Sequence, residues 1–128
     1  MLDRPLTILV LQETFAICRL TKNSSVPKWA LLGDFYSVTR TSDELSVVCS
    51  QVNVPEGITC DKGWRCLKVE GPLDLSLTGV IASLAATLAH ASISIFGVST
   101  YDTDYLMVRE KDLQRAVLVL SQAGHEVH

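Results

Sequence analysis

The sequence predicts an α+β fold made of two small tandem subdomains, and two features of the apolar pattern predict it. Between Val69 and Arg109 the apolar residues change from strand spacing to helix spacing and then return to strand spacing for two further strands. Before this stretch, short β-branched runs alternate with polar turns and leave little room for helix. The chain has 128 residues, of which 48% are hydrophobic, which fits one domain or two small ones with ample core.

The second half of the chain predicts a complete unit with the order β-α-β-β-α-β. We expect strands at residues 64–70, 93–99 and 104–109, helices at 77–91 and 112–123, and a closing strand at 126–128. Ser76 or Thr78 is available as the N-cap of the first helix, and Gly124 fits the C′ position of the second. This order is that of a split βαβ or ferredoxin-like unit, in which both helices pack on one face of the sheet.

The first half predicts a subdomain that is mostly β. We expect strands at residues 6–11, 15–20, 35–39 and 45–50, and one helical turn at 28–32. The polar break Gln12–Glu13–Thr14 is interpreted as the turn of a hairpin between the first two strands. Glycine and proline residues between Val54 and Gly63 indicate a linker. We therefore expect a helix-poor subdomain over residues 1–62 and an α+β domain over 63–128.

Charge and cysteine usage exclude several classes of function. The net charge of −3 and the absence of a Lys/Arg run argue against a nucleic-acid-binding surface. The four cysteines form no C-x-x-C pair and the three histidines are scattered, so we expect neither a zinc site nor another cofactor. The first residues lack a basic region followed by an apolar one, which predicts a cytoplasmic protein with reduced thiols.

One stretch, Leu77–Val98, is almost uncharged and long enough to cross a bilayer. Its spacing, however, changes from the helix period to the strand period at Ala91–Ser92. Serine, threonine and histidine are also frequent in it. We therefore expect no membrane insertion.

Polar residues gather at the joints of the second half. Asp74, Ser76 and Thr78 precede the first helix, and the run from Thr100 to Asp104 separates two strands. Polar side chains at loop corners over an apolar scaffold are typical of a binding site. Each also has a plainer structural explanation, because Asp is common in turns and Ser or Thr at N-caps.

The chemistry of this corner suits a zwitterion. The backbone amides at Leu77, Thr78, Gly79 and Val80, together with the helix dipole, can hold an α-carboxylate. The α-ammonium, or a basic side chain, has three candidate carboxylate partners, namely Asp74, Asp102 and Asp104. The Tyr101 ring can stack over a cation or cover an interface. The two tryptophans, Trp29 and Trp64, are interpreted as packing residues.

Several of these motifs resemble a known family. The runs Val69–Gly79, Ile93–Ile95 and Ser99–Tyr105 are similar to the ACT domain. More narrowly, they resemble small two-ACT proteins related to the cytosolic arginine sensor of TOR signalling. Phe35–Thr41 and Glu44–Cys49 resemble the first-half signature of the same group. The resemblance implies a ferredoxin-like βαββαβ ACT domain preceded by a helix-poor, ACT-like β subdomain.

ACT domains are regulatory modules that bind amino acids, usually at an interface between two ACT units. The resemblance implies that one unit contributes Ser94, Ile95 and Tyr101 to the ligand. It implies that the facing unit contributes Asp74, Leu77, Gly79, Val80, Thr100, Tyr101 and Asp104. The sensor has a carboxylate where this chain has Leu77, and a glycine where it has Asp74. One chain carries one pair of units, so this arrangement would require a homodimer.

Three functions remain after these exclusions. The first is a non-catalytic regulatory protein that binds a free amino acid. The second is a structural pairing module that docks on a larger protein partner without a ligand. The third, an enzyme, is disfavoured because no Ser-His-Asp, Cys-His, metal-ligand or phosphate-loop pattern stands out.

Overall fold

The computed structural model describes residues 5–71, 73 and 79–128, which form two compact units. One unit contains the described residues up to Gln12 together with Arg65–His128, and the other contains Glu13–Trp64. Two long strands, β1 (Thr7–Leu20) and β4 (Cys60–Val69), contribute a segment to each unit.

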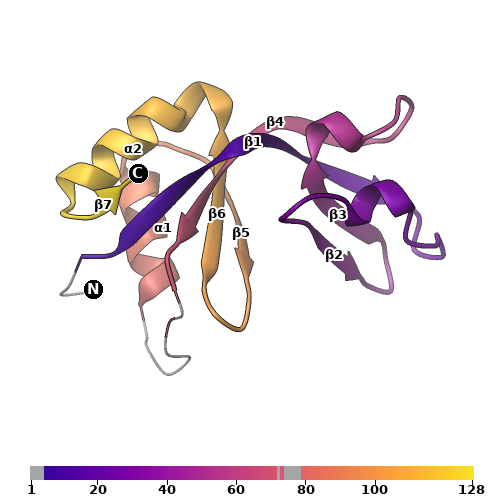
Figure 1. The fold of residues 1–128 in the computed structure, drawn as a ribbon, viewed down its shortest axis with the longest axis horizontal. Helices are drawn as coiled ribbons and strands as arrows, with labels where there is room; N and C mark the ends of the chain where they lie inside the picture. Colours follow the sequence, from indigo (N-terminus) through magenta and orange to yellow (C-terminus); the bar gives the residue numbers. More distant parts are fainter. Residues whose placement is uncertain (1–4, 72, 74–78) are drawn as a thin grey trace. The chain divides into compact units, whose positions relative to one another are not determined.

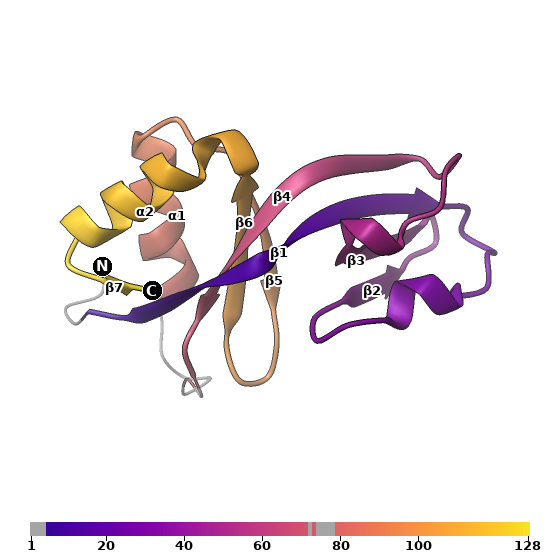
Figure 2. The ribbon, with the colours of Figure 1, turned by 45° about the horizontal axis from the view of Figure 1, so that its top comes forward.

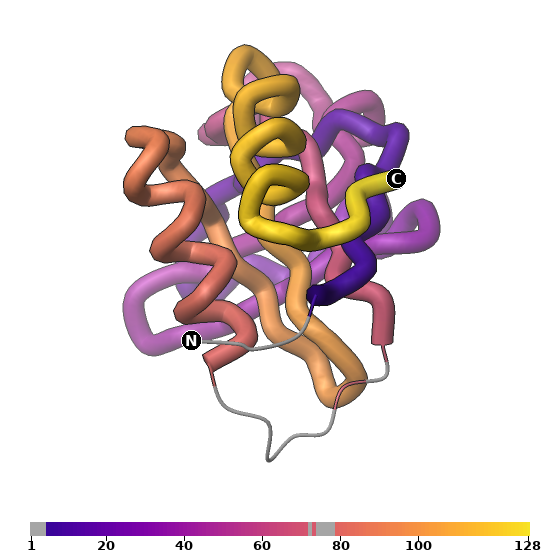
Figure 3. Tube along the Cα trace, turned by 90° about the vertical axis from the view of Figure 1, so that its left-hand side faces the viewer, coloured from indigo at the N-terminus to yellow at the C-terminus, as the bar shows by residue number. Residues whose placement is uncertain are grey.

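The first unit is a mixed sheet covered by two helices on one face, as Figure 3 shows. From β4 onward its elements are α1 (Val80–His90), β5 (Ile95–Ser99), β6 (Asp104–Arg109), α2 (Leu113–Gln122) and β7 (Glu126–Val127). The strands lie in the order β7-β1-β4-β6-β5 (Figure 1). The βαββαβ order of a ferredoxin-like unit is thus confirmed, with β1 as an additional strand between β7 and β4.

The core of this unit follows from the helix and strand periods. The buried residues of α1 are Val80, Leu84 and Leu88, at a spacing of four residues. The buried residues of α2, Ala116 and Leu120, have the same spacing. They pack against alternate residues of the strands, including Ile8, Leu67, Val69, Leu106 and Val108. Each fully buried leucine stabilises the fold by roughly 1.5–3 kcal/mol. This core fixes where α1 begins relative to the β5–β6 hairpin.

The second unit is helix-poor, as expected. Its strands lie in the order β2 (Ser37–Arg40), β3 (Leu45–Ser50), β1 and β4. Residues 13–64 are all described, and they contain two 3₁₀ turns, at Lys28–Leu31 and Gln51–Asn53, and no α-helix. One core cluster of this unit consists of small and sulfur-containing side chains: Ala16, Cys18, Ala30, Val47 and Cys49. Phe15 and Leu45 are also fully buried in this unit.

The predicted hairpin at Gln12–Glu13–Thr14 is wrong, because β1 runs through these residues as one strand (Figure 2). None of the three is Gly, Pro, Asn or Asp, so the segment lacks the residues that a tight turn requires. The predicted linker also ends earlier than expected, because β4 already begins at Cys60. Gly63 has a φ of 80° and lets the strand continue through an irregular position.

The chain passes from one unit to the other between residues 12 and 13 and between residues 64 and 65, whereas the division expected from the sequence lies at 62/63. The described start of the chain pairs with β7, which places it with the C-terminal unit. Within the described ranges, neither helix has the length and apolar content needed to cross a bilayer. The stretch considered as a membrane span contains both the end of α1 at His90 and the start of β5 at Ile95.

Candidate functional site

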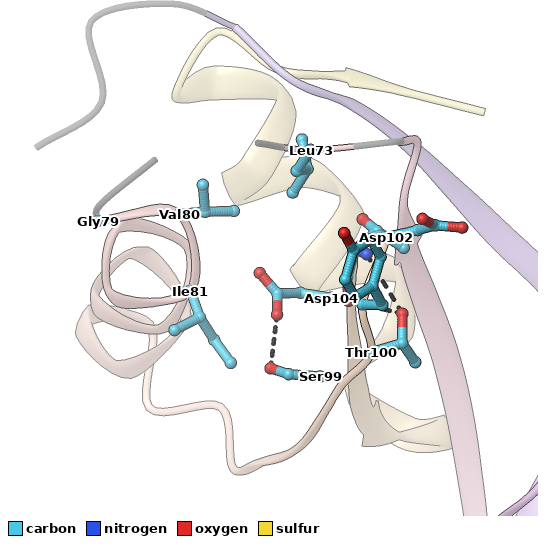
Figure 4. Close-up of a pocket in the computed structure, with 10 residues that line it drawn as sticks. Leu73, Gly79, Val80, Ile81, Ser99, Thr100, Asp102 and Asp104 are labelled. Atoms are coloured by element: carbon cyan, nitrogen blue, oxygen red, sulfur yellow. Dashed lines mark hydrogen bonds between the residues drawn. The ribbon is translucent and has the colours of Figure 1, made fainter. Parts of the chain in front are cut away.

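A hollow of about 210 Å³ lies in the first unit, between the start of α1 and the β5–β6 turn (Figure 4). Its described lining residues come from the segment after β4, from α1 and from the turn: Leu73, Gly79, Val80, Ile81, Ser99, Thr100, Tyr101, Asp102, Thr103 and Asp104. One wall is aliphatic and the other is polar and acidic. Among these described residues none is basic.

The turn at residues 100–103 is held in shape by its own threonines. The backbone N–H of Thr100 donates to the Thr103 carbonyl at 2.8 Å, and the Thr103 N–H donates to Thr100 Oγ1 at 3.2 Å. Thr103 is 5% exposed, and its Oγ1 donates to the carbonyl of Val69 at 2.5 Å. These bonds fix the turn both internally and to the end of β4.

A second connection joins the turn to the segment after β4. The backbone N–H of Leu73 donates to the Asp102 carbonyl at 2.6 Å. Close by, a Cβ on Gly71 would lie 2.9 Å from the same carbonyl oxygen, closer than real Cβ contacts. The glycine is therefore required by the close approach of the two backbones.

Asp104 supplies the carboxylate of the hollow. It is the first residue of β6 and pairs with Ser99, the last residue of β5. The Ser99 hydroxyl donates to Asp104 Oδ1 at 2.5 Å. In Figure 4 the carboxylate extends into the space between α1 and the hairpin. A carboxylate held in this way can accept hydrogen bonds from a cation or an ammonium group.

The start of α1 forms the opposite side of the hollow. Gly79 occupies the N-cap position with a φ of 83°, a left-handed conformation that favours glycine. The Ser83 N–H donates to the Gly79 carbonyl at 2.8 Å, which closes the first turn of the helix. The amides of a helix's first turn have no acceptor within the helix, and they and the dipole favour an anion. An amide-rich helix start and a carboxylate thus line one hollow.

The structure brings together five of the predicted ligand-binding residues, namely Gly79, Val80, Thr100, Tyr101 and Asp104. Asp102, a further candidate carboxylate partner, also lines the hollow. It does not bring Ser94 and Ile95 to the hollow, because they lie at the beginning of β5 whereas Ser99 lies at its end. Asp74, Leu77 and Thr78, and the N-cap candidate Ser76, lie outside the described residues.

Sequence reasoning did not include Leu73, Ile81, Ser99 and Thr103 among the site residues. A signal for Ser99 was present, because a four-residue loop between the expected strands pairs Ser99 with Asp104. Ile81 carried no such signal, because its place in the hollow depends on how α1 lies over β5.

The remaining chemistry-bearing residues have packing environments. Trp64 is buried, and Trp29 packs against the core of the second unit. Burial raises the pKa of Cys18 and of Cys66 to about 12, which disfavours the reactive thiolate. In the part of the chain that the structure describes, no group of three or more His, Cys, Asp or Glu residues could hold a metal ion.

Comparison with known proteins shows the family of this chain. The family model of the ACT domain matches residues 59–122, which is half of the chain. The chain belongs to the ACT domain family. A second family model, described only as the N-terminal domain of its group, matches residues 13–57. The two matches correspond to the α+β part and the helix-poor part of the chain.

Three relatives illustrate the range of this similarity. A crystal structure of an Agobacterium tumefaciens protein is 38% identical with a TM-score of 0.93, covering 98% of this chain and 94% of the other. The cytosolic arginine sensor for mTORC1 subunit 1 of Bos taurus is 26% identical over 99 residues, which cover 69% of this chain and 30% of the sensor. The regulatory subunit of aspartate kinase from Thermus thermophilus is 11% identical with a TM-score of 0.64, covering 94% of this chain and 99% of the other.

The aspartate kinase subunit is similar in fold alone. This chain spans less than two thirds of the length of the curated relatives that it matches. It is thus a member of a regulatory family that is related to amino-acid sensing.

Proposed function

We propose that this protein is a non-catalytic regulatory sensor that binds a free amino acid at an interface between ACT units. The observation that carries the proposal is the pairing, in one hollow, of the α1 start at Gly79 and Val80 with the carboxylate of Asp104. An α-amino acid carries a carboxylate and an ammonium group on one carbon atom. The helix start suits the first and Asp104 suits the second.

The quaternary arrangement is part of the proposal. Tyr101 is 80% exposed at the rim of the hollow, where a facing unit would cover it. Ser94 and Ile95 do not line the hollow of their own unit, so in the proposed arrangement they contribute from the facing one. A cytoplasmic homodimer in which the hollow of one chain meets β5 of its partner would satisfy both expectations.

A panel of the twenty amino acids tests the proposal by thermal shift and by calorimetry. A ligand at one hundred times its Kd stabilises the folded protein by about 2.7 kcal/mol. For a small domain this raises Tm by roughly 10 °C. Asp104→Asn keeps the shape of the side chain, removes its charge and should abolish the shift. Asp34→Asn changes an exposed carboxylate of the other unit and should leave the shift intact.

Loss of response in both variants, or no response of the native protein to any amino acid, would overturn the sensor proposal. Light scattering with and without the ligand tests the dimer, and a chain that binds the ligand fully as a monomer contradicts an interface site. An enzymatic role would instead appear as turnover that Asp104→Asn removes.

A second function, docking on a larger protein without a ligand, is favoured by one observation. Four large apolar side chains of the second unit are exposed within a short segment: Val26, Leu31, Leu32 and Tyr36. Exposed apolar side chains that gather in this way are typical of protein-binding surfaces. Co-purification from the native cell that is lost with Leu31→Ser and Leu32→Ser, in a chain that responds to no amino acid, supports this alternative.

A further inference from the structure

Ile81 lies in the wall of the hollow, where α1 packs over β5. It is the second residue of α1, it lines the hollow, and it is 38% exposed. In Figure 4 its side chain extends from the helix toward Ser99 on β5. Two residues earlier in that strand, a Cβ placed on Gly97 would lie 3.3 Å from Ile81 Cδ1. The isoleucine therefore packs on a strand position that carries no side chain.

The glycine at this position is explained by the packing and not by its backbone. Gly97 is absent from the residues with a positive φ, so other residues could adopt its conformation. Glycine in a strand interior is otherwise unfavourable and often marks the close approach of another group. A side chain here would push Ile81 by a few tenths of an ångström. Gly97 thus determines how far Ile81 reaches into the hollow.

The lining of the hollow also limits the class of ligand. Asp104 contributes the carboxylate that extends into the hollow, whereas that of Asp102 points away from it in Figure 4, and the described lining residues include no base. Asp104 would repel an acidic side chain, because like charges at close range are unfavourable. Once Asp104 binds the α-ammonium, no second carboxylate among the described lining residues extends into the hollow to pair with a basic side chain. Of the aliphatic lining residues, Val80 is 5% exposed and belongs to the core. Ile81 is the residue of α1 whose aliphatic surface is open to a ligand side chain.

We propose that Ile81, seated on Gly97, sets the length of aliphatic side chain that the hollow accepts, and that the ligand is a neutral amino acid. This inference rests on the proposed function, because it assigns specificity within the same site. With the carboxylate at the start of α1 and the ammonium at Asp104, the ligand side chain runs along the aliphatic wall and ends at Ile81.

The experiment uses the full chain and a series of unbranched amino acids: alanine, 2-aminobutyrate, norvaline and norleucine. Calorimetry of the native protein should show affinity rising along the series and then falling by about 10- to 200-fold at the first side chain that is too long. Ile81→Val removes Cδ1, and Ile81→Ala removes two further carbon atoms. In both variants the fall in affinity should occur at a longer ligand side chain than in the native protein.

Two further variants separate a local effect from a general one. Gly97→Ala should lower the affinity for the longest accepted ligand, and adding Ile81→Val should restore it, because the valine lacks the atom that the new Cβ would meet. Leu118→Ala is the matched control. Leu118 is also a large aliphatic residue exposed on a helix, at 54%, but it does not line the hollow. This variant should keep the native preference.

The outcomes distinguish this inference from the function on which it rests. If the native protein binds only basic or aromatic members of the twenty-amino-acid panel, the inference fails and the sensor proposal stands. The inference also fails, and the sensor proposal stands, if the Ile81 variants change the affinities for all ligands by the same factor. The same holds if Leu118→Ala shifts the preferred side-chain length as much as the Ile81 variants do. If no amino acid binds the native protein, both fail.

Discussion

The buried hydroxyl of Thr103 holds the acidic turn in place, and replacing it with valine tests this directly. Thr103 Oγ1 donates to the Val69 carbonyl at 2.5 Å, and the two residues are 5% and 1% exposed. Valine has nearly the same shape but no donor, so the carbonyl remains buried and loses this partner. A buried group that loses its hydrogen bond costs about 1–3 kcal/mol. With a urea m-value of roughly 1–3 kcal/mol per molar, the unfolding midpoint should fall by about 1 M.

Far-UV circular dichroism in urea is the suitable assay, because both tryptophans lie within Glu13–Trp64 and report on the other unit. Thr87→Val is the matched control. The hydroxyl of Thr87 donates at 3.1 Å to the carbonyl of Ser83, within a helix whose carbonyls already accept backbone bonds. We expect a change below about 0.5 kcal/mol there. Equal effects of the two substitutions would refute the role given to the Thr103 hydroxyl.

Three further predictions concern stability and reactivity. Burial lowers the pKa of His125 below its ordinary 6.5, so the unfolded chain takes up the proton first as the pH falls. The free energy of unfolding should therefore decrease below pH 6.5, as measured by urea titrations at different pH values. This decrease should be smaller in His125→Gln, whereas the control His90→Gln, at an exposed position, should show the same decrease as the native protein. Burial raises the pKa of Cys18 and Cys66 to about 12, so iodoacetamide at a pH of about 8 should label both thiols slowly in the folded protein and rapidly in urea. Mass spectrometry measures the labelling, and rapid labelling of the folded protein would contradict this prediction. Gly71→Ala places a Cβ 2.9 Å from the Asp102 carbonyl oxygen and should destabilise the protein by about 1–3 kcal/mol in the same urea assay. An unfolding midpoint equal to that of the native protein would show that the chain accommodates the Cβ without a loss of stability.

The element order was predictable because local signals agree with the tertiary fold in the second half. The strand at Asp104–Arg109 begins and ends where the apolar run predicts, and in the first half so does the strand at Leu45–Ser50. The expected hairpin at residues 12–14 failed for a physical reason. Polar residues inside a strand can lie on its exposed side, and Gln12 is exposed. Only the pairing of β1 with other strands, which sequence alone does not reveal, keeps the chain extended there.

The polar part of the hollow was predictable and its aliphatic wall was not. Thr100, Tyr101 and Asp104 are marked by their place in a tight turn between two apolar runs. Ile81 instead follows the apolar pattern of a helix and is indistinguishable in sequence from a core residue. Its position becomes evident only when α1 is seen lying over Gly97. An apolar pattern indicates which face of a helix or strand is buried, but not which residues of other elements that face contacts.

The most direct test of the sensor account is a ¹H–¹⁵N NMR titration of the full chain with each amino acid that stabilises it. We expect saturable shifts of the backbone amides of Gly79, Val80 and residues 99–104, and the loss of these shifts in Asp104→Asn. Shifts confined to the unit formed by Glu13–Trp64, or binding that leaves the amides around the hollow unchanged, would contradict it.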